Sequence, residues 1–309
     1  MMERKKVGKL LLIIGVLLSL VIVNSACIAA VKKEIIEDAI HVNIAFCKEP
    51  GINGEIIYKN GANNPILLKV GKGSNTYSKK EILRGEIISR DYTISPTGLI
   101  AYVSSDSIHL ALAETGKEKI ESRLSEEPSW SPRGDKFVYC YQGKLISYDI
   151  ANKSKHILSE GKKIRRPLWI SEDQIIFVKD DNITILNLTN NEEKYITTEK
   201  ASYPRLIYDS QKHVVYFVRR LKGSYGILQY KLKTKELSTV INGNFQLLGL
   251  GPKGDSIYLI DIDNKRQLFS YDLKTKAKTI IEDKNAVDGI STYDGSALLY
   301  STFDKLYLY

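Results

Sequence analysis

Short apolar runs separated by polar turns recur along the chain from about residue 42 to its end. Turn markers stand at intervals of 36, 40, 38, 42 and 41 residues, at Ser95, Ser131, Ser171, Asp209, Gly251 and Thr292. Each marker is followed by an apolar run, then by a strand that closes on a polar turn, and then by a final strand. Four short antiparallel strands in about 40 residues are typical of one blade of a β-propeller.

The clearest turns have the pattern Ser-Pro-x-Gly, at Ser95–Gly98 and Ser131–Gly134. Proline presets φ and glycine accepts the left-handed conformation that reverses the chain between two strands. Outside residues 10–31 the chain shows no helical periodicity. The pattern therefore predicts an all-β propeller of four-stranded antiparallel blades.

Two segments resemble the TolB-like family of propeller repeats. Pro128–Tyr139 is similar to the first two strands of that repeat. Ile44–Tyr58 is similar to its second and third strands, and Asn63–Leu68 would supply the outer strand. The resemblance covers residues 42–309 and implies the fold, whereas such propellers include binding proteins and accessory domains of enzymes alike.

The chain favours seven blades of about 39 residues, with six as the alternative. The last repeat stops in its third strand, at Leu306–Tyr309, and an N-terminal strand that completed it would remove an exposed edge. Glu34–Val42 could supply that strand, or could be the innermost strand of the first blade. If Ile66–Val70 closed the ring instead, residues 42–60 would form an extra hairpin and the blades would number six.

The N-terminus has the pattern of a membrane signal. Residues 10–31 carry no charge, and a helix of this length can cross a hydrocarbon core of about 30 Å. Four basic residues precede the run and two follow it directly, which places the N-terminus inside and the rest outside. We therefore expect a signal-anchor or lipoprotein signal segment at residues 1–33. Residues 34–309 would then form an extracellular propeller at the cell membrane, held by a single pass or a lipid.

Three fates of this segment remain open. Cys27 follows Asn24, Ser25 and Ala26, a pattern similar to a bacterial lipoprotein cleavage site and a possible lipidation site. An apolar residue is usual where Asn24 stands, and the uncleaved anchor is favoured by the length of the run. Ordinary signal cleavage near Ala29 or Ala30 is the third alternative.

Composition and charge narrow the functional classes. With 43% hydrophobic and 26% charged residues, the chain is neither disordered nor a small disulfide scaffold. The net charge is +9, of which residues 1–33 carry +5, so the body has only a mild basic excess and no nucleic-acid partner is expected. Cys47 and Cys140 fall in the first and third blades, too far apart for a disulfide.

No catalytic constellation stands out. The four histidines occupy non-equivalent blade positions, so they are not expected to converge on a metal; they are His41, His109, His156 and His213. A Gly-x-Ser-x-Gly motif is absent from the sequence, which excludes an α/β-hydrolase nucleophile. We predict no catalytic residues, no metal and no cofactor.

The best candidate binding surface lies on the loops that lead into the innermost strands. Its predicted residues are five basic side chains and one aromatic, namely Lys162, Lys163, Arg165, Arg166, Arg205 and Tyr203. Such a cluster could bind an anionic polymer of the cell envelope or an acidic protein partner. Trp130 and Trp169 stand at equivalent positions and are interpreted as packing residues between blades.

These features favour a non-enzymatic, membrane-tethered propeller that binds a protein or an envelope polymer as a scaffold. The alternative is a cell-envelope glycan lyase or hydrolase whose active site in the channel has no signature in the sequence. A sensor that signals through a membrane partner is a third hypothesis, because the nine residues before the apolar run are too few for a domain.

Overall fold

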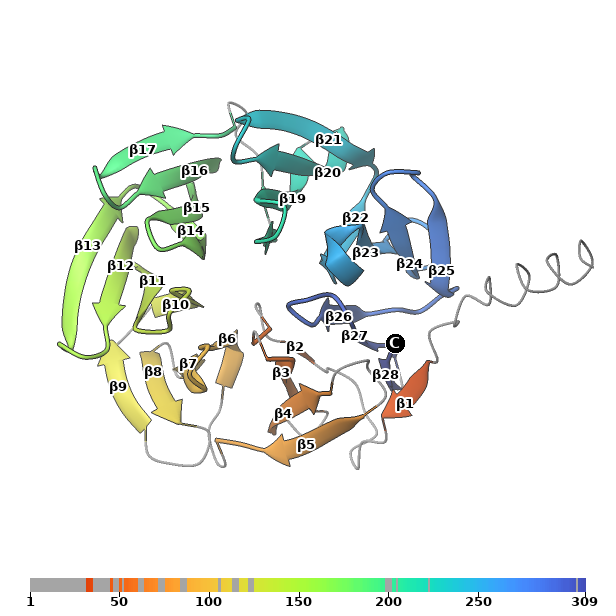
Figure 1. The fold of residues 1–309 in the computed structure, drawn as a ribbon, viewed down its shortest axis with the longest axis horizontal. Helices are drawn as coiled ribbons and strands as arrows, with labels where there is room; N and C mark the ends of the chain where they lie inside the picture. The colour runs from red at the N-terminus through yellow and green to blue at the C-terminus, as the bar shows by residue number, and fades with distance from the viewer. Residues whose placement is uncertain are drawn as a thin grey trace, which may run out of the picture.

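Seven four-stranded antiparallel sheets surround a central axis in the computed structural model (Figure 1). The structure describes residues 32–35, 45–46, 50–51, 53–60, 64–71, 76–83, 88–104, 107–112, 117–121, 125–197, 202–203, 205–221, 223–303 and 305–309. In each sheet the strands follow one another from the axis to the perimeter. The predicted propeller fold and its seven blades are thereby confirmed.

The blades are numbered one to seven in chain order. Their innermost strands are β2 (Ala45–Phe46), β6 (Ile88–Ile94), β10 (Ser125–Trp130), β14 (Ile164–Ser171), β18 (Leu206–Asp209), β22 (Phe245–Leu250) and β26 (Asp288–Ser291). The second strands are β3 (Glu55–Lys59), β7 (Leu99–Ser104), β11 (Lys136–Tyr141), β15 (Gln174–Lys179), β19 (Val214–Leu221), β23 (Ser256–Asp261) and β27 (Leu298–Ser301). The third strands are β4 (Pro65–Val70), β8 (Ser107–Leu112), β12 (Lys144–Asp149), β16 (Asn182–Asn187), β20 (Ser224–Lys231), β24 (Gln267–Asp272) and β28 (Leu306–Leu308). The outer strands are β5 (Tyr77–Glu81), β9 (Lys117–Glu121), β13 (Ser154–Glu160), β17 (Glu192–Tyr195), β21 (Glu236–Asn242), β25 (Lys278–Glu282) and, in blade seven, β1 (Lys33–Ile35).

The second strands carry the apolar core because both of their faces are covered by neighbouring blades. In β15 the four residues Ile175–Val178 are all buried, and β11 and β23 share this pattern. Outer strands have the opposite character, since every residue of β17 is exposed. A continuous apolar run is what a strand needs when it is buried on both faces, which explains why these runs were the strongest signal in the sequence.

The ring closes through β1, the N-terminal strand. It pairs antiparallel with β28, with Lys33 opposite Leu308 and Ile35 opposite Leu306. Ile35 is 2% exposed and packs in the apolar core between blades seven and one. Closure by an N-terminal strand is confirmed. The strand begins one residue before the predicted stretch Glu34–Val42 and ends at Ile35.

The predicted strand order of blade one is wrong by one position. Ala45–Phe46 forms the innermost strand and Glu55–Lys59 the second, while Pro65–Val70 is the third strand and not the outer one. The outer strand is Tyr77–Glu81, of which the last four residues are exposed. A strand without buried apolar residues leaves no alternating pattern, so the preceding apolar run was mistaken for it.

Two faces of the ring are used below. The leading face holds the ends at which the innermost strands begin, together with the hairpins between second and third strands. The trailing face holds the turns between first and second strands and the hairpins between third and outer strands. Because neighbouring strands of a blade are antiparallel, these connections alternate between the faces.

Several predicted features fall outside the described residues. These are the apolar run at 10–31, with Cys27 and the sites near Ala29 and Ala30, as well as His41 and Cys47. Within the described part of the chain, no helix has the length and hydropathy that a membrane crossing requires. Cys140 is buried and forms no disulfide with any residue that the structure describes.

We predict that the protein loses stability between pH 10 and pH 12. Burial raises the pKa of Tyr216 to about 12, and the nearby carboxylate of Asp209 adds to this rise. An unfolded tyrosine titrates near pH 10. The folded state binds the phenolic proton of Tyr216 more tightly than the unfolded state does, and this difference stabilises the fold. The contribution is fully present below pH 10 and is lost as the pH rises toward 12.

Urea unfolding at about pH 9 and at about pH 11 measures this loss. In Tyr216→Phe the midpoint should fall less than in the native chain. Burial also raises the pKa of Tyr258 and Tyr300, so a part of the fall persists in the variant. Tyr195→Phe is the matched control, because its ring is 54% exposed. An equal fall in both variants would contradict the assignment.

Candidate functional site

A central channel of about 830 Å³ runs along the axis of the ring. Every blade contributes an apolar residue to its lining, from the innermost strand or just after it: Pro50, Ile94, Trp130, Leu168, Leu206, Leu248 and Ile290. Hydroxyl groups stand at the end of the channel on the trailing face, where Ser131, Ser210 and Thr292 line it. The channel is thus an apolar cavity with a polar mouth, the usual character of a ligand site.

The two tryptophans pack at equivalent places in the channel wall, as predicted. Trp130 is 6% exposed, lies 5.2 Å from the Phe137 ring and donates its Nε1–H to the carbonyl of Thr93 in blade two. Trp169 is 8% exposed, and its buried Nε1–H has no hydrogen-bond partner among the described residues. A buried donor without a partner is costly, so the Trp169 indole gains nothing from its Nε1–H within the described structure.

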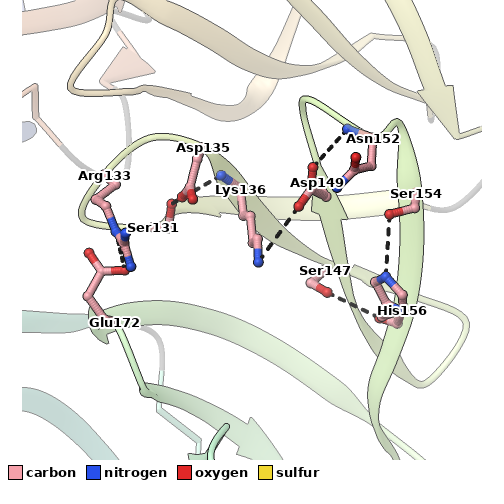
Figure 2. Close-up of polar contacts among 10 residues, drawn as sticks. All are labelled: Ser131, Arg133, Asp135, Lys136, Ser147, Asp149, Asn152, Ser154, His156 and Glu172. Carbon is pink, nitrogen blue, oxygen red and sulfur yellow. Dashed lines mark hydrogen bonds and ion pairs between the residues drawn. The ribbon is translucent and has the colours of Figure 1, made fainter.

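Few ionisable groups line the channel. Arg205 is half-buried in the wall and donates from Nη2 to the carbonyl of Leu248, at 3.0 Å. Among the described lining residues Glu172 is the one carboxylate, and it accepts a hydrogen bond from Nε of Arg133 at 2.8 Å. Figure 2 shows this pair joining the trailing-face turns of blades three and four. These contacts give Arg205 and Glu172 structural roles.

The histidines do not converge. His109 is on β8, where its ring stacks on Tyr102 at 5.3 Å. His156 is on the outer strand β13, where it bonds to Ser154 (Figure 2). His213 lies at the trailing-face mouth of the channel, with Nδ1 3.1 Å from the hydroxyl of Tyr208. Burial raises the pKa of Tyr208, so this hydroxyl keeps its proton at neutral pH.

Three of the predicted basic side chains form ion pairs with acidic side chains. Lys163 and Arg165 share the carboxylate of Asp181, with nitrogen–oxygen distances of 3.7 and 2.8 Å. Arg166 pairs with Glu127 of blade three at 3.0 Å, and the Glu127 side chain is 7% exposed. The sequence did not reveal these pairs, because Asp181 lies in the next hairpin and Glu127 in another blade.

Two of the predicted surface residues point elsewhere. Tyr203 is 1% exposed and packs edge-on against Phe217 at 5.8 Å, so its place as a surface aromatic was wrong. Arg205 lies in the channel wall, away from the other four basic residues. Lys162 and Lys163 are the exposed members of the predicted cluster.

The sequence analysis missed the channel lining itself. Most of its residues come in small groups from the innermost strands and the turns after them, and they lie up to about 240 residues apart in the chain. The repeat offers one signal that could have found them. Trp130 and Leu168 stand one or two residues beyond the Pro128 and Pro167 bulges, and an apolar residue follows at the same place in later blades.

Comparison with known proteins shows the fold alone. No family model and no curated protein matches the chain. Oligogalacturonate lyase from Vibrio parahaemolyticus is similar with a TM-score of 0.70 at 11% identity, over 90% of this chain and 92% of that one. TolB from Acinetobacter baumannii is similar with a TM-score of 0.53 at 16% identity, over 86% of this chain and 63% of that one. The chain thus has a TolB-like propeller fold, whose similar structures include an enzyme as well as TolB.

A further similar structure is an oligogalacturonate lyase in complex with manganese, with a TM-score of 0.67 at 10% identity, covering 90% of this chain and 95% of that one. The residues described in this chain do not fit such a metal. They include no group of three histidine, cysteine, aspartate or glutamate side chains placed to hold an ion. A manganese site needs several oxygen or nitrogen ligands converging on one point.

Proposed function

We propose that this chain is a non-enzymatic propeller that binds a segment of a partner protein in its central channel. The observation that carries the proposal is the apolar lining, to which all seven blades contribute. An extended segment that placed apolar side chains there would gain the free energy of removing them from water, about 25 cal/mol per Å².

The same lining argues against the alternative of a glycan hydrolase. Acid–base cleavage of a glycosidic bond uses a pair of carboxyl groups about 5–10 Å apart. The described channel lining offers Glu172 alone, and that carboxylate is paired with Arg133 at the exposed rim. The apolar wall would also leave the hydroxyl groups of a sugar chain without hydrogen-bonding partners.

The proposal includes the setting that the sequence predicts. The apolar run at residues 10–31 would tether the propeller to the outer side of the cell membrane as an uncleaved anchor, or Cys27 would do so through a lipid. At that location Lys162 and Lys163, exposed on the leading face, would provide a secondary contact for an anionic envelope polymer. Their charge contrasts with the apolar channel, which is why we assign the main site to a protein segment.

A charge placed in the channel tests the proposal. In Leu206→Lys the ammonium would enter the apolar lining, so peptide affinity should fall at least about tenfold, which corresponds to about 1.4 kcal/mol. Leu237→Lys is the matched control, because Leu237 is 40% exposed on the outer strand of the same blade. The full chain in neutral detergent is immobilised and presented with a random decapeptide library displayed on phage, and the affinities of recovered peptides are measured.

Three results would contradict the proposal. The library could yield no retained peptide, Leu206→Lys could bind the recovered peptides as well as Leu237→Lys does, or the chain could cleave an envelope glycan. The first two would remove the channel as a peptide site. The third would establish the enzyme.

A further inference from the structure

A second cavity, of about 760 Å³, lies between blades five and six on the trailing face. Four lysines line it: Lys212 from a turn between first and second strands, Lys231 from the end of β20, and Lys233 and Lys274 from the hairpins before two outer strands. Asp255 and Asp272 are the carboxylates among its described lining residues. We call this cavity the lysine groove. Its lining carries an excess of positive charge, in contrast to the channel.

The lysine groove and the central channel share part of their walls. His213 and Lys233 line both cavities, so the groove adjoins the trailing-face mouth of the channel. The hydroxyl of Tyr208, 3.1 Å from Nδ1, holds the His213 imidazole at this junction. A ligand that leaves the channel at this mouth therefore meets the groove at His213 and Lys233.

Only some of the charged side chains in the groove form salt bridges within the protein. Lys212 donates to Asp255 at 2.7 Å and to the carbonyl of Gly254 at 2.8 Å, and Lys231 donates to Glu236 at 2.8 Å. Lys233 and Lys274 are exposed and form no ion pair with any residue that the structure describes. Asp272 accepts hydrogen bonds from the backbone of Lys274 and Thr275 within its own turn, which lower its pKa. Lys233 and Lys274 thus stand outside the salt bridges of the described residues, and the charge of Lys274 also helps to lower the pKa of the Asp272 carboxyl.

We propose that the lysine groove binds the acidic part of an extended polypeptide whose apolar part occupies the channel. The inference rests on the proposed function and adds the chemistry of the partner: apolar residues followed or preceded by aspartate or glutamate. Lys233 and Lys274 would pair with these carboxylates, because the groove that they line adjoins the mouth of the channel that holds the apolar part. Charged pairs at a rim steer association and set specificity.

A polypeptide fits this pair of cavities better than an anionic wall polymer does. Such a polymer carries a charge on every repeat, and moving those charges into the apolar channel would cost far more than the groove returns. The side chains of a polypeptide can be apolar in one part and charged in the next. Successive residues of an extended segment advance about 3.3 Å, so a few residues span each part. A polypeptide can therefore be apolar in the channel and acidic in the groove.

Charge reversal in the groove tests the inference. The full chain in neutral detergent is presented with the same decapeptide library, and the compositions recovered on the native chain and on K233E/K274E are compared. The native chain should recover peptides with an apolar block next to an acidic block. The variant should bind those peptides at least about tenfold more weakly and should recover basic blocks instead.

The matched control is K235E/K276E. Both of its lysines lie in the same two hairpins and are exposed, but neither lines the groove. The double variants change the net charge equally, so a general effect of charge would weaken both. Only the groove variant should lose the acidic preference.

The outcomes separate the inference from the proposed function. Retention of no peptide would overturn both. Recovery of purely apolar peptides, or of the same peptides on K233E/K274E as on the control, would overturn the lysine groove and leave the channel. Inorganic polyphosphate is a further probe. If it bound the native chain, bound K233E/K274E more weakly and did not compete with the peptides, the groove would be a polyanion site. That result would overturn the assignment to a polypeptide.

Discussion

Ile35→Asp should lower the free energy of unfolding by about 4 kcal/mol or more. Ile35 is 2% exposed in the core between blades seven and one, and it lies on the strand that closes the ring. The substitution removes a buried apolar side chain and leaves a carboxylate in its place. Both effects act on β1, a strand of three residues, so we expect β1 to detach and the edge of β28 to become exposed.

Urea unfolding and amide hydrogen exchange in blade seven measure this effect. Glu34→Thr is the matched control on the same strand. Glu34 is exposed and pairs with Lys305 at 3.0 Å, a surface pair that contributes up to about 1 kcal/mol. Ile35→Asp with the stability of the native chain would mean that β1 does not hold the ring closed.

Trp130→Ala should cost about 3–5 kcal/mol, the range for removing a buried aromatic side chain. The indole packs on Phe137 in the core between blades two and three, and its Nε1–H reaches the carbonyl of Thr93 across that boundary. The substitution leaves a cavity and an unpaired carbonyl. Thermal unfolding followed by near-ultraviolet circular dichroism measures the loss.

The two tryptophans allow the hydrogen bond to be separated from the packing. Trp130→Phe keeps most of the apolar volume but leaves the Thr93 carbonyl without its donor, and such a loss costs about 1–3 kcal/mol. Trp169→Phe removes an Nε1–H that has no partner within the described structure, so it should cost less. Equal losses of stability in the two phenylalanine variants would contradict the assignment of a hydrogen bond to Trp130 alone of the two indoles.

The blade array was predictable because its strongest signals are local. A buried second strand is an apolar run in sequence, and the turn before it has proline and glycine at fixed places. The outer strand of blade one was not predictable in this way, since Tyr77–Glu81 exposes four of its five residues. The closing strand β1 was foreseen from the missing strand of the last repeat and not from its own three residues.

The candidate site was harder to predict because its residues meet only in the closed ring. The channel collects side chains from seven blades, and the lysine groove collects lysines from two hairpins and a turn. The predicted cluster at Lys163, Arg165 and Arg166 had the right residue types for an anion site. Its partners Asp181 and Glu127 are supplied by other segments, and charge counted along the sequence does not include them.

The way the chain enters blade seven also has a mechanical consequence. Lys32 lies over the Tyr307 ring at 3.8 Å and forms an ion pair with Glu282 of blade six, and β1 begins at the next residue. A pull on the chain ahead of Lys32 would therefore be carried first by this ion pair and then by the three residue pairs between β1 and β28. The ring would fail under load at the seam where it closes, while blades one to five, each built from one continuous segment, would bear no direct force.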